Sequence, residues 1–329
     1  MTLARPSALL TVDGREFTAQ QAALVGLVVR LESGSHDRCE LTLWPQSALA
    51  GAAPGASLDV ALGALGAEEP VWSGALDAVR RTPATVVLEA LGHTAALSRA
   101  RVSASWSSQS VADIVRDLAG DVKVDAVDVD VDLASYSVDD RRTVWSHLRE
   151  LAQWTGAQLS ASTDGALRFV RVGAPRPAHS LRHGADVVEW RIGPRATSPA
   201  PTVVAHGSAS ENGASRWHWT RRDPVGVAAA PTRVPAVFAD RAGADTLATA
   251  LRTRAERGGV RGRVVTLGRA SLRAGEWLEI VDLPGGDLGP LLALSVEHRL
   301  DGSAGFLTAI RVEGPGGGGL AGGLLGGLL

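Results

Sequence analysis

The sequence predicts a mainly β protein, built as two β-barrels with a small α+β unit inserted between them. Most of the chain consists of short segments in which apolar and polar residues alternate with period two, as in half-buried strands. The middle of the chain differs, because it carries two stretches with apolar residues at helical spacing. Strand starts in the first and last parts of the chain follow nearly the same rhythm, which is typical of a duplicated unit.

Residues 1–92 are predicted to form the first β-barrel domain. The segment ALLTVDGREF alternates around Asp13 and Gly14, and an Asp-Gly pair between two such runs is a strong hairpin signal. LVGLVVRLES and DRCELTLW alternate in the same way, and SLDVALG, VWSGALDAVRR and ATVVLEALG follow. Breaks that contain Gly or Pro separate these segments, so we expect short strands that end near Gly92.

Residues 93–188 are predicted to form the inserted α+β domain. SSQSVADIVRDLAG has a serine at the N-cap position, apolar residues at helical spacing and a glycine at its end. DDRRTVWSHLRELAQWTG repeats this form, and Gly156 closes a helix that we expect over residues 143–154. Asp164 and Gly165 then predict a hairpin, and the run DVKVDAVDVDVD predicts one strand with a solvated acidic face.

Residues 189–313 are predicted to form the second β-barrel domain. Strand-like segments return here, and one helix, expected over about residues 243–257, interrupts them. Its closing strands repeat the spacing of those in the first domain, which predicts a duplicated barrel. Leu58 and Val60 correspond to Leu278 and Ile280. Trp72 and Leu76 correspond to Leu292 and Val296, and Val86 and Leu88 correspond to Leu307 and Ala309.

Residues 314–329 form a Gly- and Leu-rich tail, GPGGGGLAGGLLGGLL. Its proline and the four glycines that follow predict a flexible tether. The tail is too short for a membrane span, which needs about 20 mostly apolar residues. If it becomes helical, Leu320, Leu324 and Leu328, which are four residues apart, lie on one stripe, with glycines opposite that permit close packing. A disordered tail is the alternative to docking on a partner through Leu320, Leu324, Leu325, Leu328 and Leu329.

The composition is globular and carries no strong charge bias. Charged residues make up 21% and hydrophobic residues 45% of the 329 residues, and the formal net charge is -2. Because no global basic field is present, we predict no nucleic-acid specificity, and we also predict no membrane span. The one cysteine, Cys39, excludes an internal disulfide, and the N-terminal segment lacks a signal-peptide pattern, which predicts a cytoplasmic protein.

No catalytic or cofactor motif is found in the sequence, so we expect no enzyme activity, no cofactor and no metal. His179 and His183 have the i,i+4 spacing of two zinc ligands, but they lie in a proline-rich segment without a third ligand. Trp217 and Trp219 share one face of a predicted strand, which suits a core or a sugar-stacking platform. The arginine-rich segment at 252–263 suits a helix C-terminus or an anionic partner.

Two segments resemble the phage late control protein D family and the hub part of VgrG-type spikes. The first, SVADIVRDLAG…ASYSVDDRRTVWSHLRELAQWTGAQLSASTDGALRF, has a similar helix opening, Y-x-V strand, L-x-x-L-A-x-x-x-G helix and short hairpin. The second, LRAGEWLEIVDLPGGDLGPLLALSVEHRLDGSAGFLTAIRVEG, is similar to the closing segment of the family. The matching positions are Tyr136, Val138, Leu148, Leu151, Ala152 and Gly156, and then Val296, His298, Gly305, Phe306 and Thr308.

The resemblance implies a structural baseplate hub of a contractile phage tail or of a phage-like contractile injection system. Family members have two barrels that resemble the tube subunit, so a ring of three copies presents six barrels to a sixfold tube. The implied partners are two further copies in a homotrimer, the tail tube or a tube adaptor, the spike, other baseplate proteins and the tape measure protein. VgrG-type chains continue into a spike domain where this chain has its tail, so the spike is expected to be a separate polypeptide.

Two other functions compete with the hub. A β-rich glycan-binding adhesin would use Trp217 and Trp219, since aromatic rings stack on sugars. A cell-wall hydrolase would need a pair of carboxylates placed for acid–base chemistry, and the sequence marks no such pair.

Overall fold

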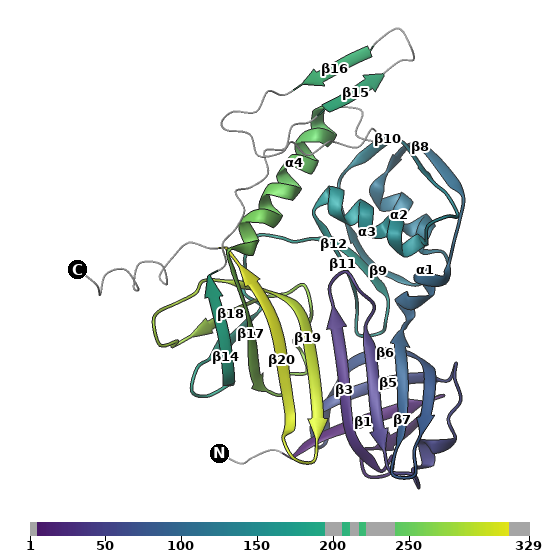
Figure 1. The fold of residues 1–329 in the computed structure, drawn as a ribbon, viewed down its shortest axis with the longest axis vertical. Helices are drawn as coiled ribbons and strands as arrows, with labels where there is room; N and C mark the ends of the chain where they lie inside the picture. The colour runs from purple at the N-terminus through teal and green to yellow at the C-terminus, as the bar shows by residue number, and fades with distance from the viewer. Residues whose placement is uncertain (1–4, 195–205, 211–216, 222–240, 316–329) are drawn as a thin grey trace, which may run out of the picture.

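The computed structural model describes residues 5–194, 206–210, 217–221 and 241–315. These residues form a large β body and an α+β unit beside it (Figure 1). A long helix, α4 (Arg241–Glu256), lies along the α+β unit and ends above the β body (Figure 1). The expectation of a mainly β protein is confirmed.

The β body contains strands from both the first and the last part of the chain. The first part contributes β1 (Pro6–Val12), β2 (Arg15–Thr18), β3 (Leu24–Glu32), β4 (Arg38–Leu43), β5 (Ser57–Ala64), β6 (Ala67–Arg81) and β7 (Val86–Gly92), with a 3-10 helix η1 (Ala48–Gly51) between β4 and β5. The later part contributes β13 (His179–Arg182), β14 (Val187–Pro194), β17 (Val260–Leu267), β18 (Trp277–Val281), β19 (Leu291–Asp301) and β20 (Gly305–Gly314).

These thirteen strands form one sheet in which the two parts repeat the same spatial order. The first runs β1-β5-β6-β7-β4-β3, with β2 outside β1, and the second runs β13-β18-β19-β20-β17-β14. Neighbours are antiparallel throughout, except that β13 and β18 are parallel. The repeated order agrees with the strand repeat predicted from the sequence.

The two parts of the sheet are joined directly by hydrogen bonds. β3 pairs with β4 on one side and with β19 on the other, in antiparallel register from Ser295 opposite Glu32 to Asp301 opposite Gly26. No closed barrel is found among the described strands, because β3 continues into the second part. The division into two barrels therefore stays a prediction.

The inserted unit combines short helices with two small sheets. β8 pairs with β10, and the second sheet has the order β11-β12-β9. The predicted helices and the predicted hairpin are confirmed. In order, the elements are η2 (His93–Ala95), α1 (Ala96–Arg99), β8 (Ala104–Ser110), α2 (Val111–Ala119), β9 (Val124–Asp128), β10 (Asp132–Val138), α3 (Val144–Thr155), β11 (Ala157–Ala161) and β12 (Leu167–Arg171).

The sequence places the helix ends correctly because the capping chemistry is local. The side chain of Ser110 accepts a hydrogen bond from the Asp113 N–H at the start of α2, and Thr143 does the same for the Ser146 N–H at α3. Gly156 ends α3 with φ of 71°, a left-handed conformation that favours glycine.

The acidic run differs from the single strand that was predicted. β9 ends at Asp128 and β10 begins at Asp132, so the chain between them leaves the strand conformation. The run changes sheets here, because β9 pairs with β12 whereas β10 pairs with β8. Val129 and Val131 are buried in the core of the unit while Asp130 is exposed, so the predicted alternation of sides is kept. The acidic side chains are solvated as expected.

The described residues form two separate hydrophobic cores. One fills the β body, and the other lies in the inserted unit and includes Leu247 of α4. Although β13 lies within the predicted boundaries of the inserted domain, it pairs with β18 in the β body. The remaining elements are the hairpin of β15 (His206–Ser210) and β16 (Trp217–Arg221), and a short η3 (Arg257–Gly259) after α4.

Candidate functional site

The family-like positions of the inserted unit lie in its core. Leu148 and Leu151 are fully buried on α3, and Tyr136 of β10 packs in the same cluster. The Tyr136 ring stacks on Trp106 with centroids 5.9 Å apart and meets Trp154 edge-on at 6.2 Å. Burial raises the pKa of the Tyr136 hydroxyl, and the nearby Glu150 raises it further. This arrangement holds α3 against β8 and β10.

Gly156 lies where α3 meets α4. A Cβ atom added there would stand 3.1 Å from the Ala250 Cβ of α4, in addition to being strained by the left-handed backbone. Glycine therefore permits the close approach of the two helices. This contact brings α4 from the second β segment onto the inserted unit.

His298 and Gly305 belong to the β body and lie apart from the other family-like positions. The His298 side chain is fully buried, with Nδ1 3.1 Å from the Thr308 Oγ1 and Nε2 3.3 Å from the Leu272 carbonyl oxygen. Burial lowers the pKa of His298 to about 3, so the imidazole is neutral. Gly305 has φ of 72° in the turn from β19 to β20. The family-like residues therefore lie in two cores and do not form one site.

The turn between β3 and β4 connects the β body to the inserted unit. The Gly34 N–H donates to the Leu159 carbonyl oxygen of β11 at 2.7 Å. His36 Nδ1 lies 3.1 Å from the Thr94 Oγ1 and its ring packs 4.2 Å from that of Trp145. Burial lowers the pKa of His36 to about 4, and Arg99 contributes in the same direction.

Asp37 lies next in this turn and is almost fully buried. Its Oδ1 accepts the Glu32 N–H at 2.9 Å, and its backbone oxygen accepts the Gly92 N–H at 2.8 Å. Burial raises the pKa of Asp37 to about 7, although the nearby Arg273 acts in the opposite direction. No local motif in the sequence marks this contact between the β body and the inserted unit; the one signal is the position of His36 and Asp37 in a turn after an alternating strand.

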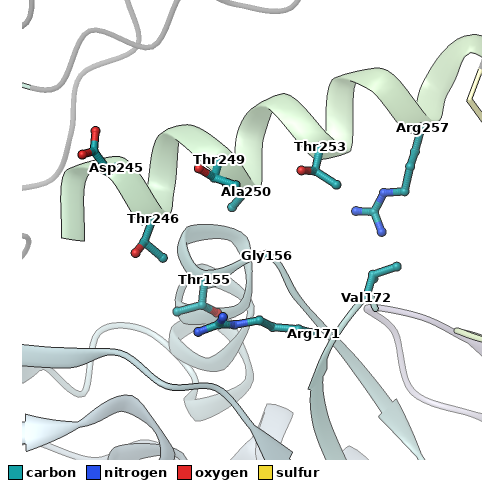
Figure 2. A pocket seen from close by; sticks show the side chains of 10 residues that line it. All are labelled: Thr155, Gly156, Arg171, Val172, Asp245, Thr246, Thr249, Ala250, Thr253 and Arg257. Atoms are coloured by element: carbon teal, nitrogen blue, oxygen red, sulfur yellow. The ribbon is translucent and has the colours of Figure 1, made fainter. Parts of the chain in front are cut away.

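Two cavities flank the contact between α3 and α4. The smaller measures about 390 Å³ and the larger about 810 Å³, and both are lined by Gly156, Ala250 and Arg257. The larger one, which we call the arginine groove, lies between α3, α4, β17 and β20. Figure 2 shows the smaller cavity, with Thr246, Thr249, Thr253 and Arg257 on its α4 side and Thr155, Arg171 and Val172 opposite.

Five arginines and two glutamates are among the described residues that line the arginine groove. Arg142 pairs with Glu150 at 2.8 Å, and Arg261 pairs with Glu313 at 3.3 Å. The remaining lining arginines are Arg149, Arg254 and Arg257. Arg254 and Arg257 come from the arginine-rich segment noted in the sequence, whereas Arg149 does not. Tertiary packing therefore gives the groove a local excess of positive charge in a chain that is almost neutral.

The structure does not support the zinc reading of the paired histidines. His179 lies on β13, where its Nε2 is 2.8 Å from the Glu276 Oε2, so the pair is not on a helix face. Among the described residues, no group of three or more His, Cys, Asp or Glu side chains is placed to hold a metal ion.

Some of the predicted positions lie outside what the structure describes. The tail positions Leu320, Leu324, Leu325, Leu328 and Leu329 lie beyond the described residues, and the side chains of Trp217 and Trp219 are not described either. Within the described ranges, every helix is too short or too polar to cross a membrane.

Comparisons with solved structures show the same fold in phage tail proteins. A tail protein from Neisseria meningitidis MC58 has a TM-score of 0.70 and 15% sequence identity, with 94% of this chain and 96% of that chain covered. The 43 kDa tail protein of prophage MuSo2 from Shewanella oneidensis has a TM-score of 0.62 and 16% identity, with 93% and 97% covered.

A third similar structure belongs to a secretion system. The E. coli c3393 protein, a type VI secretion component similar to T4 bacteriophage tail proteins gp27 and gp5, has a TM-score of 0.60 and 12% identity. The alignment covers 93% of this chain and 76% of that protein. No family model and no curated protein matches the sequence. The chain thus has the fold of phage tail proteins and of a type VI secretion component that resembles them.

Proposed function

We propose that the protein is a structural baseplate hub of a contractile phage tail or of a phage-like contractile injection system. The observation that carries this proposal is the end-to-end match to phage tail proteins, in which nearly the whole of both chains aligns. Such agreement along the full chain includes the inserted unit as well as the β body, so it is more specific than a shared β-sheet.

The repeated strand order supports a role in matching symmetries. Three copies of a chain with two equivalent β segments carry six such segments, which suits contact with a sixfold tail tube. We therefore propose that each segment acts as one tube-like barrel and that the hub is a homotrimeric ring. The proposed partners are the tube or a tube adaptor on one side and the spike on the other, with further contacts to baseplate proteins and the tape measure protein.

A match to the Francisella PdpA-VgrG complex adds to this proposal. One chain of that complex has a TM-score of 0.54 and 8% identity, and the alignment covers 95% of this chain and 53% of that chain. The protein thus corresponds in fold to about half of that chain. We assign to the protein the role of a structural hub that performs no chemistry and assembles into a particle in the cytoplasm.

The test is the assembly state of the purified chain, measured alone and in the presence of the tube protein that a neighbouring gene encodes. We expect native mass spectrometry to find a trimer and electron microscopy to show a threefold ring that caps tube ends. A chain that stays monomeric at micromolar concentration and does not bind tubes would contradict the proposal. Binding of that monomer to polysaccharide would support the adhesin, and lysis of cell walls would support the hydrolase.

A further inference from the structure

We propose that the arginine groove binds an acidic peptide segment of a partner protein, with separate carboxylates seated on Arg149, Arg254 and Arg257. This inference is independent of the hub proposal, because one copy of the chain contains the whole groove. It follows from the charge balance, the buried guanidinium and the polar lining of the groove.

Among the described residues, the arginines that line the groove outnumber its acids, and Glu313, which pairs with Arg261, also lies close enough to Arg257 to act on its charge. Glu150 and Glu313 are the two acidic side chains that line it, and Arg142 and Arg261 pair with them. Arg149 on α3 and Arg254 on α4 are exposed and face the same groove. Opposed cations on two neighbouring helices attract a negatively charged segment between them.

Arg257 shows that the groove favours a bound anion. Its Nε and Nη1 atoms are buried and have no hydrogen-bond partner among the residues that the structure describes. A buried donor without a partner costs about 1–3 kcal/mol, and more when it is charged. A carboxylate reaching Arg257 would remove this cost, since a guanidinium and a carboxylate form two parallel charge-assisted hydrogen bonds.

The position of Arg257 extends the binding surface past the contact between the helices. Arg257 lines the smaller cavity as well as the arginine groove, and Figure 2 shows its guanidinium directed between α4 and the end of β12. Arg171 lies on the opposite side of that cavity. A segment seated on Arg257 would therefore meet a further cation, Arg171, in that cavity, which Asp245 of α4 lines as well.

A peptide fits the groove better than a nucleic acid does. The described residues that line the groove include no aromatic side chain, although base stacking on aromatics is the usual source of affinity for single strands. Glu150 and Glu313 would repel a continuous line of phosphates. Gln153 and Gln158 offer amide groups that can bond to a peptide backbone between its carboxylates.

The probe for this site is a fluorescein-labelled peptide in which four glutamates alternate with glycines. Its binding to the full chain is measured by fluorescence anisotropy at about 0.15 M salt, where diffuse attraction between exposed charges is largely screened. The comparison probes are the same peptide with glutamine in place of glutamate, a single-stranded oligonucleotide of equal charge, and inorganic phosphate as a competitor.

The variants separate the groove from general positive charge. Arg149→Glu changes an exposed side chain of the groove and should not disturb folding, while Arg257→Gln removes the buried guanidinium. Arg252→Glu is the matched control, because Arg252 is an exposed arginine of the same α4 that does not line either cavity. Circular dichroism and thermal melting establish that each variant is folded.

We expect saturable binding of the glutamate peptide and no binding of the glutamine peptide. Arg149→Glu and Arg257→Gln should each weaken binding about tenfold or more, while Arg252→Glu changes it less than about twofold. Equal weakening by Arg252→Glu, or absence of saturable binding, would overturn the proposal. So would tighter binding of the oligonucleotide with the same variant dependence, or displacement of the peptide by phosphate at low millimolar concentration.

Discussion

Buried ionisable side chains give the protein opposing responses to pH at the scale of single residues. The lowered pKa values of His36 and His298 mean that both imidazoles are neutral in the folded state. Their contribution to stability is present above the unfolded pKa of about 6.5 and is lost as the pH falls towards 4. Asp37 acts in the opposite sense, because its folded pKa is raised to about 7.

The first prediction concerns Asp37→Asn. A carboxyl group with a raised folded pKa is favourable below its unfolded pKa of about 4, and that stability is lost as the pH rises towards 7. The asparagine Oδ1 can still accept the Glu32 N–H but carries no charge. We therefore expect the variant to be about 2 to 4 kcal/mol more stable than wild type at pH 8. At pH 4 the two proteins should have similar stability.

Urea unfolding at both pH values measures this difference. The contribution of His36 and His298 should fall equally in both proteins as the pH drops from about 6.5 towards their folded pKa values, since these residues are unchanged. Equal free energies of unfolding for wild type and variant at pH 8 would show that the pKa of Asp37 is not raised in the native state.

At the scale of elements, α3 organises the inserted unit. Its apolar stripe packs on β11, and its C-terminal glycine admits α4. The turn between β3 and β4 reaches the unit from the β body, so α3 receives contacts from both sides of the junction. The unit is therefore attached to the β body by packing and hydrogen bonds as well as by the chain.

The second prediction concerns Leu148→Ala on α3. Leu148 is fully buried with Leu159, Leu167 and Phe169 of the neighbouring hairpin, so the truncation leaves a cavity. We expect the free energy of unfolding to fall by about 2–5 kcal/mol, measured by denaturant unfolding followed by circular dichroism.

The neighbouring His147 provides the comparison. His147 is buried, and its Nε2 lies 3.3 Å from the Asp139 carbonyl oxygen, which is a structural contact. His147→Ala should leave particle assembly intact. If His147→Ala abolished assembly in a chain that remains folded, the assignment of α3 as a purely structural helix would be wrong.

At the scale of the whole molecule, the repeated strand order and the hydrogen bonds between β3 and β19 make one continuous β body. Backbone hydrogen bonds join the two parts of this sheet, which is the connection that the proposed hub would need to transmit force. β20 ends at Gly314, beside Glu313 of the arginine groove, and the Gly/Leu-rich tail follows from there.

The third prediction concerns deletion of residues 316–329. The five leucines of this segment gain about 1.5–3 kcal/mol each when fully buried, which favours docking on a partner. We expect the shortened chain to form trimers as well as wild type, while particles built from it carry fewer spikes or retain less cargo. Native mass spectrometry and spike occupancy in electron micrographs measure the two effects. Full spike occupancy with normal cargo retention would leave the tail without a docking role.

The sequence by itself determined the local elements of this protein. Period-two alternation indicated the strands, Ser110 and Thr143 marked helix starts, and Asp13 with Gly14 marked a hairpin, because capping and turn chemistry depend on residues a few positions apart. Only the tertiary structure decided the break in the acidic run and the pairing of β3 with β19. The tertiary structure also brought the arginines of α3, α4 and β17 together and buried Asp37. Both features depend on long-range packing, which sets the distances between side chains and their desolvation and which no local pattern encodes.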